Sequence, residues 1–222
     1  MSFFENTRKP AGFGGKLMVV MMNLSHSPVA RWGLRFLELA PDDKVLDCGC
    51  GGGANIRRLL KKCPQGVVKG IDYSPVSVEK SKKVNEAAIA EGRCAVLQGS
   101  VADMIFADDW FDAVTAFETV YFWPDLPQCF REVYRVLKPG GTFLICNESN
   151  GDTDKDEKWT KIIGGMTIYK DAELKTYLEQ AGFHDVQIHD VQIHKNEKGW
   201  LCILVQKQQY DAEGIKYSER DT

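Results

Sequence analysis

The stretch VLDCGCGGGANIRRLL, from Val45 to Leu60, places four glycines, two cysteines and one acidic residue between an apolar run and an amphipathic one. The apolar run is typical of a buried strand, and the amphipathic run is typical of a helix. A glycine-rich turn between a strand and a helix lets backbone N–H groups approach a ligand closely. Such a turn could bind a metal ion, a phosphate group or a zwitterion, and the surrounding residues decide between them.

A metal site is the weakest of the three interpretations. Cys48 and Cys50 form a CxC pair with no second pair and no neighbouring histidine, so they lack the spacing of a tetrahedral zinc site. His184, His189 and His194 are five residues apart, which places successive ones on opposite faces of a strand. We therefore expect no metal ligands in this chain.

A phosphate cradle fits the spacing better. The pattern Gly49-x-Gly51-x-x-Ala54, with Asp72 at the end of the next apolar run, matches a dinucleotide-binding fingerprint. Asp47 argues against it, because a pyrophosphate would meet this carboxylate at close range. A zwitterion suits the turn better, since the acid would take its ammonium group while the loop amides and the helix N-terminus take its carboxylate.

The rest of the chain alternates between strand and helix patterns. A three-and-four apolar spacing predicts a helix over 28–40, and Ser74 with Pro75 marks the start of a later one. Another helix, beginning at Leu126, is expected to end before Pro139. Short apolar runs typical of buried strands lie between these patterns: KVLDC, VVKGID, CAVLQG, FDAVTAF and TFLIC. This alternation favours a parallel sheet with helices on both faces.

The C-terminal part departs from the alternation. Two strand-like runs, 186–193 and 200–205, are separated by a short turn and predict an antiparallel pair at one sheet edge. We therefore expect an α/β fold: a doubly wound, mostly parallel seven-stranded sheet with an antiparallel C-terminal edge pair and an N-terminal helical lid. The expected organisation is a lid over 1–40, a core over 41–208 and a polar tail over 209–222.

Charge and hydropathy exclude some classes of partner. The 222 residues carry 28 basic and 31 acidic side chains, a formal net charge of −3. Such a chain has no broad positive field, so we expect no nucleic-acid partner. The apolar run LMVVMMNL, 17–24, is much shorter than the roughly 20 residues that span a bilayer, so we expect a buried or lid helix there and no stable membrane insertion.

The seven cysteines are scattered and mostly lie inside apolar runs, where a thiol behaves as a small hydrophobic group. This usage favours a reducing compartment, and we expect a cytoplasmic protein. The oligomeric state stays open at this point.

The pattern D-x-G-x-G-x-G, written here from Asp47 to Gly53, resembles the first motif of the class I S-adenosylmethionine-dependent methyltransferases. Four further motifs continue the resemblance in the same order over about residues 28–205: GIDYS at 70–74, LQGS at 97–100, FDAV at 111–114 and VLKPGG at 136–141. Each motif alone is weak, and their order and spacing together make a strong set.

The resemblance implies S-adenosylmethionine as cofactor, S-adenosylhomocysteine as product and a small-molecule acceptor. It implies that Asp72 binds the ribose hydroxyls. Ser100 stands where the family often has an acid that accepts a hydrogen bond from the adenine amino group, and an uncharged serine accepts it more weakly. The full expected cofactor set is Asp47, Gly49, Cys50, Gly51, Asp72, Tyr73, Ser100, Val101 and Glu118.

Methyl transfer from a sulfonium is an in-line displacement, so most of its catalysis comes from positioning. The candidate catalytic residues are Glu118, Tyr121 and His26, of which His26 or Glu118 would assist removal of an acceptor proton. Tyr121, Phe122 and Trp123 would wall the methyl group or simply pack. The segments before Ala40 and over 148–170 are expected to act as lids above the acceptor.

Two alternatives stay open on sequence grounds. The chain could be an NAD(P)-dependent oxidoreductase, or it could bind S-adenosylmethionine without catalysing transfer. The motifs leave open the identity of the acceptor and whether the methyl group goes to oxygen, nitrogen, sulfur or carbon, and the apolar lids allow a lipid-like or quinone-like acceptor.

Overall fold

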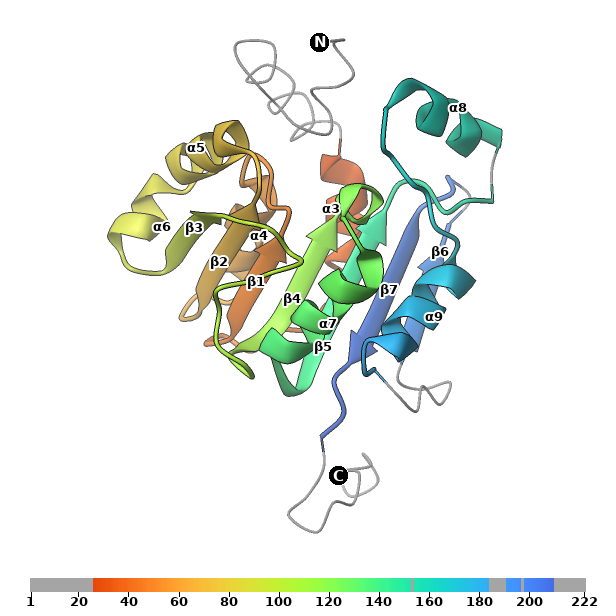
Figure 1. Ribbon diagram of the computed structural model, residues 1–222. Helices are drawn as coiled ribbons and strands as arrows, with labels where there is room; N and C mark the ends of the chain where they lie inside the picture. The colour runs from red at the N-terminus through yellow and green to blue at the C-terminus, as the bar shows by residue number, and fades with distance from the viewer. Residues whose placement is uncertain (1–25, 153, 184–190, 197, 210–222) are drawn as a thin grey trace.

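The computed structural model describes residues 26–152, 154–183, 191–196 and 198–209 (Figure 1). Within these ranges the chain forms a seven-stranded sheet in the order β3-β2-β1-β4-β5-β7-β6. Its strands are β1 (Lys44–Cys48), β2 (Val67–Asp72), β3 (Cys94–Gln98), β4 (Phe111–Phe117), β5 (Leu137–Asn147), β6 (Val191–Lys195) and β7 (Leu201–Gln206).

The first five strands run parallel, and β7 pairs antiparallel with both β5 and β6. The mostly parallel sheet with an antiparallel edge pair, predicted from the sequence, is therefore confirmed. The chain order changes direction beside β1, since β2 lies on one side of it and β4 on the other. Ligands in such sheets bind at this switch point, outside the carboxyl ends of the strands.

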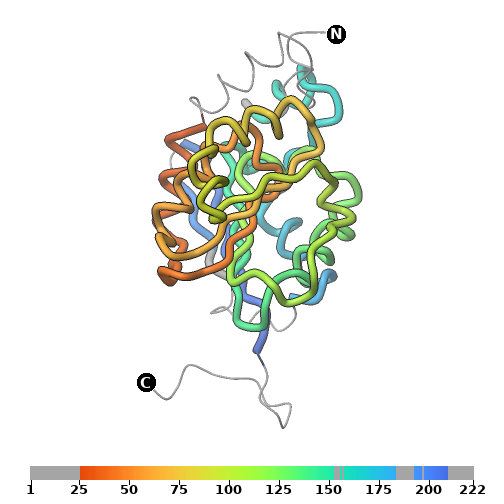
Figure 2. The backbone as a smooth tube through the Cα atoms, turned by 90° about the vertical axis from the view of Figure 1, so that its left-hand side faces the viewer, coloured from red at the N-terminus to blue at the C-terminus, as the bar shows by residue number. Residues whose placement is uncertain are grey.

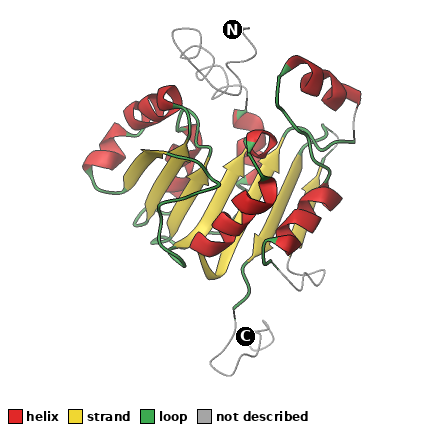
Figure 3. Cartoon of the chain, viewed as in Figure 1, coloured by secondary structure: helices red, strands yellow, loops and turns green. Residues whose placement is uncertain are grey.

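Helices cover both faces of the sheet, so the molecule has three layers (Figures 2 and 3). The helices are α3 (Ser27–Gly33), α4 (Ala54–Lys62), α5 (Pro75–Val84), α6 (Glu86–Ala90), α7 (Leu126–Val136), α8 (Asp154–Ile162) and α9 (Asp171–Gln180), with a short 3₁₀ helix η1 (Val120–Phe122). One apolar core lies under α7 and α9, and a second lies under α3, α4 and α5. Because both faces are covered, the central strands are almost continuously apolar, as their sequences indicated.

Most predicted elements lie close to their expected bounds, and one helix is shorter. The helix expected over 28–40 ends at Gly33, and the next turns use shorter-range bonds, from Arg35 N–H to Trp32 C=O and from Phe36 N–H to Gly33 C=O. Gly33 lies directly against β5, where a Cβ would come within 2.4 Å of Cys146 Sγ. Close packing on the sheet thus fixes the end of α3, which periodicity alone does not reveal.

The start of β5 also differs from the expectation. The strand begins at Leu137 and includes the KPGG stretch, whereas the apolar run TFLIC starts at Thr142. Phe111 pairs with Leu137 across a register irregularity, so β4 extends the ladder into that stretch. Pairing with a neighbouring strand lengthened β5 beyond its apolar segment.

Several expectations lie outside the described residues. They include the lid helix over 17–24, His184, His189 and nearly all of the polar tail. None of the helices in the described ranges combines the length and the apolar character that crossing a bilayer requires.

Candidate active site

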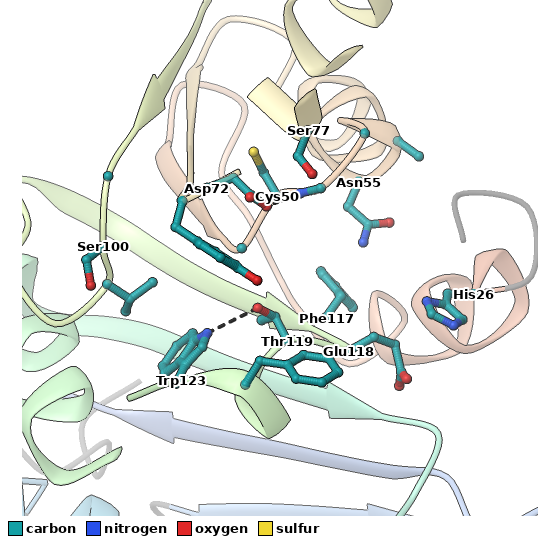
Figure 4. Close-up of a pocket in the computed structure, with 18 of the residues that line it drawn as sticks. His26, Cys50, Asn55, Asp72, Ser77, Ser100, Phe117, Glu118, Thr119 and Trp123 are labelled. Atoms are coloured by element: carbon teal, nitrogen blue, oxygen red, sulfur yellow. Dashed lines mark hydrogen bonds between the residues drawn. The ribbon is translucent and has the colours of Figure 1, made fainter. Parts of the chain in front are cut away.

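A cavity of about 490 Å³ opens at the carboxyl ends of β1, β2 and β4. This volume lies within the range of small-molecule sites, about 300 to 1,000 Å³. Its walls come from the glycine loop, the first turns of α4, the ends of β2 and β4, and the residues around Ser100. Figure 4 shows Ser100 at one end of the cavity and His26 with Glu118 at the other, so the site is elongated.

The glycine loop owes its shape to a close approach and to unusual backbone angles. Gly49 has φ +68°, and a Cβ on it would lie 1.9 Å from Thr119 Oγ1, on the loop that follows β4. Gly51 has φ +51°, and a Cβ on it would meet no atom within 4 Å beyond its chain neighbours, so a side chain there would enter the cavity. The loop therefore needs glycine for backbone freedom, for contact with Thr119 and for open space.

Asp72 ties the end of β2 to this loop. Its carboxylate accepts hydrogen bonds from the N–H of Gly51 and the N–H of Ser74, both at 2.9 Å. Burial raises the pKa of Asp72, and these two backbone donors oppose the rise. The carboxylate lines the cavity, so it is placed to accept further hydrogen bonds from hydroxyl groups of a ligand.

Asp47 lies beneath the loop, outside the lining of the cavity. Its side chain is 1% exposed, and its Oδ1 accepts a hydrogen bond from Thr115 Oγ1 at 2.8 Å. Among the described residues, Oδ2 has no hydrogen-bond partner. Burial raises the pKa of Asp47 to about 7. The loop lies between Asp47 and the cavity. The direct bond from this carboxylate to a ligand ammonium group, expected from the sequence, therefore stays a prediction.

The remaining predicted cofactor residues meet at the cavity. Tyr73, Ser100, Val101 and Cys50 all line it. Ser100 Oγ accepts a hydrogen bond from the N–H of Ala102 at 3.1 Å, which holds the loop that follows β3. Burial raises the pKa of the Cys50 thiol well above its usual range, so this cysteine is a packing group and an unreactive thiol.

His26 and Glu118 lie at the other end of the cavity, and the fold adds Glu148 to them. The three side chains each offer a nitrogen or oxygen atom, and these atoms lie within 4.8 Å of one another. Burial and the nearby Glu148 raise the pKa of Glu118 well above its usual range, whereas burial lowers the pKa of His26 to about 4. The histidine is therefore uncharged near neutral pH.

Tyr121 lies near this cluster: burial, and after it the charge of Glu118, raise the pKa of its hydroxyl well above its usual range. Its side chain is 3% exposed and does not line the cavity. Its hydroxyl accepts a hydrogen bond from the N–H of Ser149 at 2.9 Å and lies 3.3 Å from the carbonyl oxygen of Ser149. The structure thus gives Tyr121 a position in which it holds the segment after β5, next to Glu148.

Aromatic side chains form an apolar wall near Glu118. Phe117, Phe122 and Trp123 line the cavity, and the Trp123 indole N–H donates to Thr119 Oγ1 at 3.1 Å (Figure 4). The same Thr119 packs against Gly49, so one residue connects the wall to the glycine loop.

The sequence analysis missed four residues that the fold brings to the end of the cavity near His26 and Glu118: Asn55, Arg58, Thr119 and Glu148. Arg58 donates to Asn55 Oδ1 and to Ser27 Oγ, both at 2.6 Å, and so joins α4 to the start of α3. Asn55 and Arg58 are three residues apart on the helix after the glycine loop, so their spacing predicts that they share one face of that helix. Glu148 immediately follows β5, as Glu118 follows β4, so the strand ends place both acids at the same edge of the sheet.

The fold and the cavity define a class of protein. Residues 46–145 match the family model of a methyltransferase domain. This match covers 100 of the 222 residues, and the sheet order agrees with it: the chain has the fold of the class I S-adenosylmethionine-dependent methyltransferases and resembles that family.

Similar proteins agree with this class. Cycloartenol-C-24-methyltransferase of Arabidopsis thaliana is 34% identical over 157 residues, which cover 66% of this chain and 46% of that relative. The chain thus spans less than half the length of that relative.

Two solved structures share the fold at low sequence identity. Phosphoethanolamine N-methyltransferase 2 of Haemonchus contortus, solved with S-adenosylhomocysteine, has a TM-score of 0.73 at 14% identity and covers 94% of this chain and 61% of its own. Geranyl diphosphate C-methyltransferase of Streptomyces coelicolor has a TM-score of 0.66 at 14% identity and covers 90% of this chain and 87% of its own.

The residues present fit S-adenosylmethionine. The open position at Gly51 leaves room for a ligand against the loop, and the Asp72 carboxylate beside it can accept hydrogen bonds from ribose hydroxyls. The elongated cavity leaves space between Ser100 and Glu118 for a ligand with an aromatic base at one end and an amino-acid group toward the other.

Proposed function

We propose that this chain is an S-adenosylmethionine-dependent methyltransferase that transfers a methyl group to a small-molecule acceptor. One observation carries the proposal: a single cavity joins the Asp72 carboxylate and the glycine loop, at one end, to His26, Glu118 and an aromatic wall at the other. A cofactor held by the first group would present its methyl group toward the second.

The cofactor would be held by groups of this chain in fixed positions. Asp72 would take the ribose hydroxyls, the Ser100 region would take the adenine, and the amides of the glycine loop with the N-terminus of α4 would take the carboxylate. In its ionised form, Asp47 beneath the loop would attract the ammonium group, through the loop rather than by direct contact. The bound cofactor would supply an electrophilic methyl group on a sulfonium.

The chain would then contribute position and proton removal. Holding two reactants in line can contribute about 7 to 11 kcal/mol. Glu118 is the stronger candidate for proton acceptor, because its raised pKa makes its ionised form a better base than an ordinary carboxylate. The lowered pKa of His26 makes that imidazole a weak base, which suits it to accept a hydrogen bond from an acceptor hydroxyl or amine without taking the proton.

The acceptor would have an apolar body and reach the cavity past Phe122, Trp123 and Pro124. The C-24-methyltransferase relative is named for an acceptor of this kind, the sterol cycloartenol, which supports a lipid-like substrate. We propose no nucleic-acid partner, in view of the net charge of −3.

The segment before Ala40 and residues 148–170 are proposed as lids, because His26 and Gly165 from these two segments both line the cavity. A reducing, cytoplasmic location is proposed from the cysteines, all seven of which are buried and unpaired.

The test is incubation of the purified chain with S-adenosylmethionine and a panel of sterol, quinol, phenol and amine acceptors, with S-adenosylhomocysteine release as readout. Product that needs both the chain and an acceptor supports the proposal. Tight cofactor binding without turnover on any acceptor favours a non-catalytic binding protein, and hydride transfer with NADH favours an oxidoreductase.

A further inference from the structure

We propose that His26, Glu118 and Glu148 form a binding site for one divalent transition-metal ion at the acceptor end of the cavity. The three residues come from separate parts of the chain, before α3, after β4 and after β5, so no local spacing pattern indicates them. One imidazole nitrogen and two carboxylate oxygens lie within 4.8 Å of one another. Small side-chain rotations would close this set onto metal bonds of about 2.0 to 2.2 Å.

The sheet fixes the two carboxylates beside each other. Phe117 and Cys146 are register partners in β4 and β5, and the N–H of Glu118 donates to the carbonyl oxygen of Cys146 at 3.0 Å. One carboxylate oxygen of Glu118 also accepts a hydrogen bond from the N–H of Glu148. Two acidic groups held together repel each other when both are ionised, and a cation between them removes that repulsion.

His26 supplies an independent observation that points to a ligand. Its side chain makes no capping hydrogen bond to α3, and no hydrogen bond to another described residue contributes to its pKa. The imidazole lines the cavity on the same side as Glu118 (Figure 4). His26 is partly buried, and a metal ion is a common partner for the ring nitrogens of a histidine.

The donor set indicates which ions fit. One nitrogen with two carboxylates suits Mn²⁺, Fe²⁺ or Zn²⁺ better than Mg²⁺ or Ca²⁺, which prefer oxygen ligands alone. Three protein ligands leave coordination positions open toward the cavity, as in catalytic metal sites. This role rests on the proposed function: the ion would bind an oxygen atom of the acceptor, and Glu118, the proton acceptor of the metal-free chain, would then serve as a ligand beside His26.

The test is metal binding by the full chain, measured without any turnover. The chain is freed of metal with a chelator, and MnCl₂ or ZnCl₂ is titrated in by calorimetry, with Mn²⁺ electron paramagnetic resonance as a second readout. We expect one ion per chain. The variants His26→Ala, Glu118→Gln and Glu148→Gln should each weaken binding at least tenfold, whereas the exposed Glu38→Gln should not change it.

The controls distinguish a failure of the metal site from a failure of the proposed methyltransferase function. Circular dichroism and S-adenosylhomocysteine titration show whether each variant still folds and binds the cofactor. Absence of stoichiometric binding to the parent chain, or equal binding by all three variants, overturns the metal site. If the parent chain then still transfers methyl groups in the presence of chelator, the proposed function stands and only the metal site is lost.

Discussion

The carboxylate of Asp72, at the end of β2, accepts a hydrogen bond from the backbone N–H of Gly51 at 2.9 Å. This contact joins the two motifs that lie 21 residues apart in the chain and that the cofactor would bridge. It fixes the glycine loop in relation to the acid, so a change at either residue affects both.

Asp72→Ala removes the loop anchor and the proposed acceptor for ribose hydroxyls. Hydrogen bonds to charged groups are worth about 1.5 to 3 kcal/mol, so we expect S-adenosylhomocysteine affinity to fall about 10- to 100-fold in calorimetry. Asp42→Ala, at an exposed carboxylate before β1, serves as the control and should bind like the parent chain. Equal affinity of Asp72→Ala and the parent would remove Asp72 from the cofactor site.

Gly49→Ala combines backbone strain with a steric conflict, and Gly92→Ala separates the two effects. Both glycines have positive φ, +68° and +74°, but only the Cβ at position 49 meets another atom, Thr119 Oγ1 at 1.9 Å. A left-handed alanine costs roughly 1 to 2 kcal/mol, so Gly92→Ala should lower the free energy of unfolding by about that much. Gly49→Ala should lower it further and weaken cofactor binding as well. Matching denaturation curves for the two variants would show that the loop does not pack on Thr119 in this way.

Asp47 predicts a pH dependence of stability. Its pKa rises from 3.8 to about 7 on folding, because burial disfavours the charged form. The folded chain therefore binds this proton more tightly than the unfolded chain, and the contribution of Asp47 to stability falls as pH rises from about 4 to about 7.

Asp47→Asn removes that contribution. The free energy of unfolding of the variant, minus that of the parent chain, should therefore increase from pH 4 to pH 7 and stay constant above pH 7. Urea denaturation at several pH values measures this difference. A difference that stays constant with pH would show that the Asp47 carboxylate titrates normally.

Tyr121→Phe distinguishes a positioning role from a direct catalytic one. The substitution leaves the N–H of Ser149 without its acceptor, which costs about 1 to 3 kcal/mol in a buried site. We expect lower thermal stability and a higher KM for the acceptor, with cofactor affinity unchanged. The control Tyr177→Phe removes a hydroxyl on α9, outside the cavity. A large loss of kcat at full stability would instead support the catalytic role predicted from the sequence.

The strands were predictable because their apolar runs are short, buried on both faces and bounded by turn residues. β1 and β2 match KVLDC and VVKGID residue for residue. Helix ends were less predictable, since the end of α3 depends on the contact between Gly33 and Cys146, more than a hundred positions later in the chain. The apolar spacing within residues 28–40 does not depend on that contact and so cannot predict where the helix ends.

The sequence indicated which residues line the cavity around the glycine loop, because a strand, a glycine loop and a helix place them locally. It did not indicate the arrangement of the acceptor end, since Glu118 and Glu148 become neighbours only through the register of β4 and β5. His26 reaches them only because α3 packs against β5. Tyr121, three residues from Glu118, turns instead toward Ser149. The direction of a side chain in a short 3₁₀ segment is set by its contacts and not by its place in a motif.

The most direct test of the cofactor assignment is competitive calorimetry of the purified chain with S-adenosylhomocysteine, S-adenosylmethionine and NADH. Binding of the two methionine-derived ligands at one site per chain, lost in Asp72→Ala, with no heat from NADH, is the predicted result. Saturable NADH binding in the absence of any affinity for S-adenosylmethionine would contradict it.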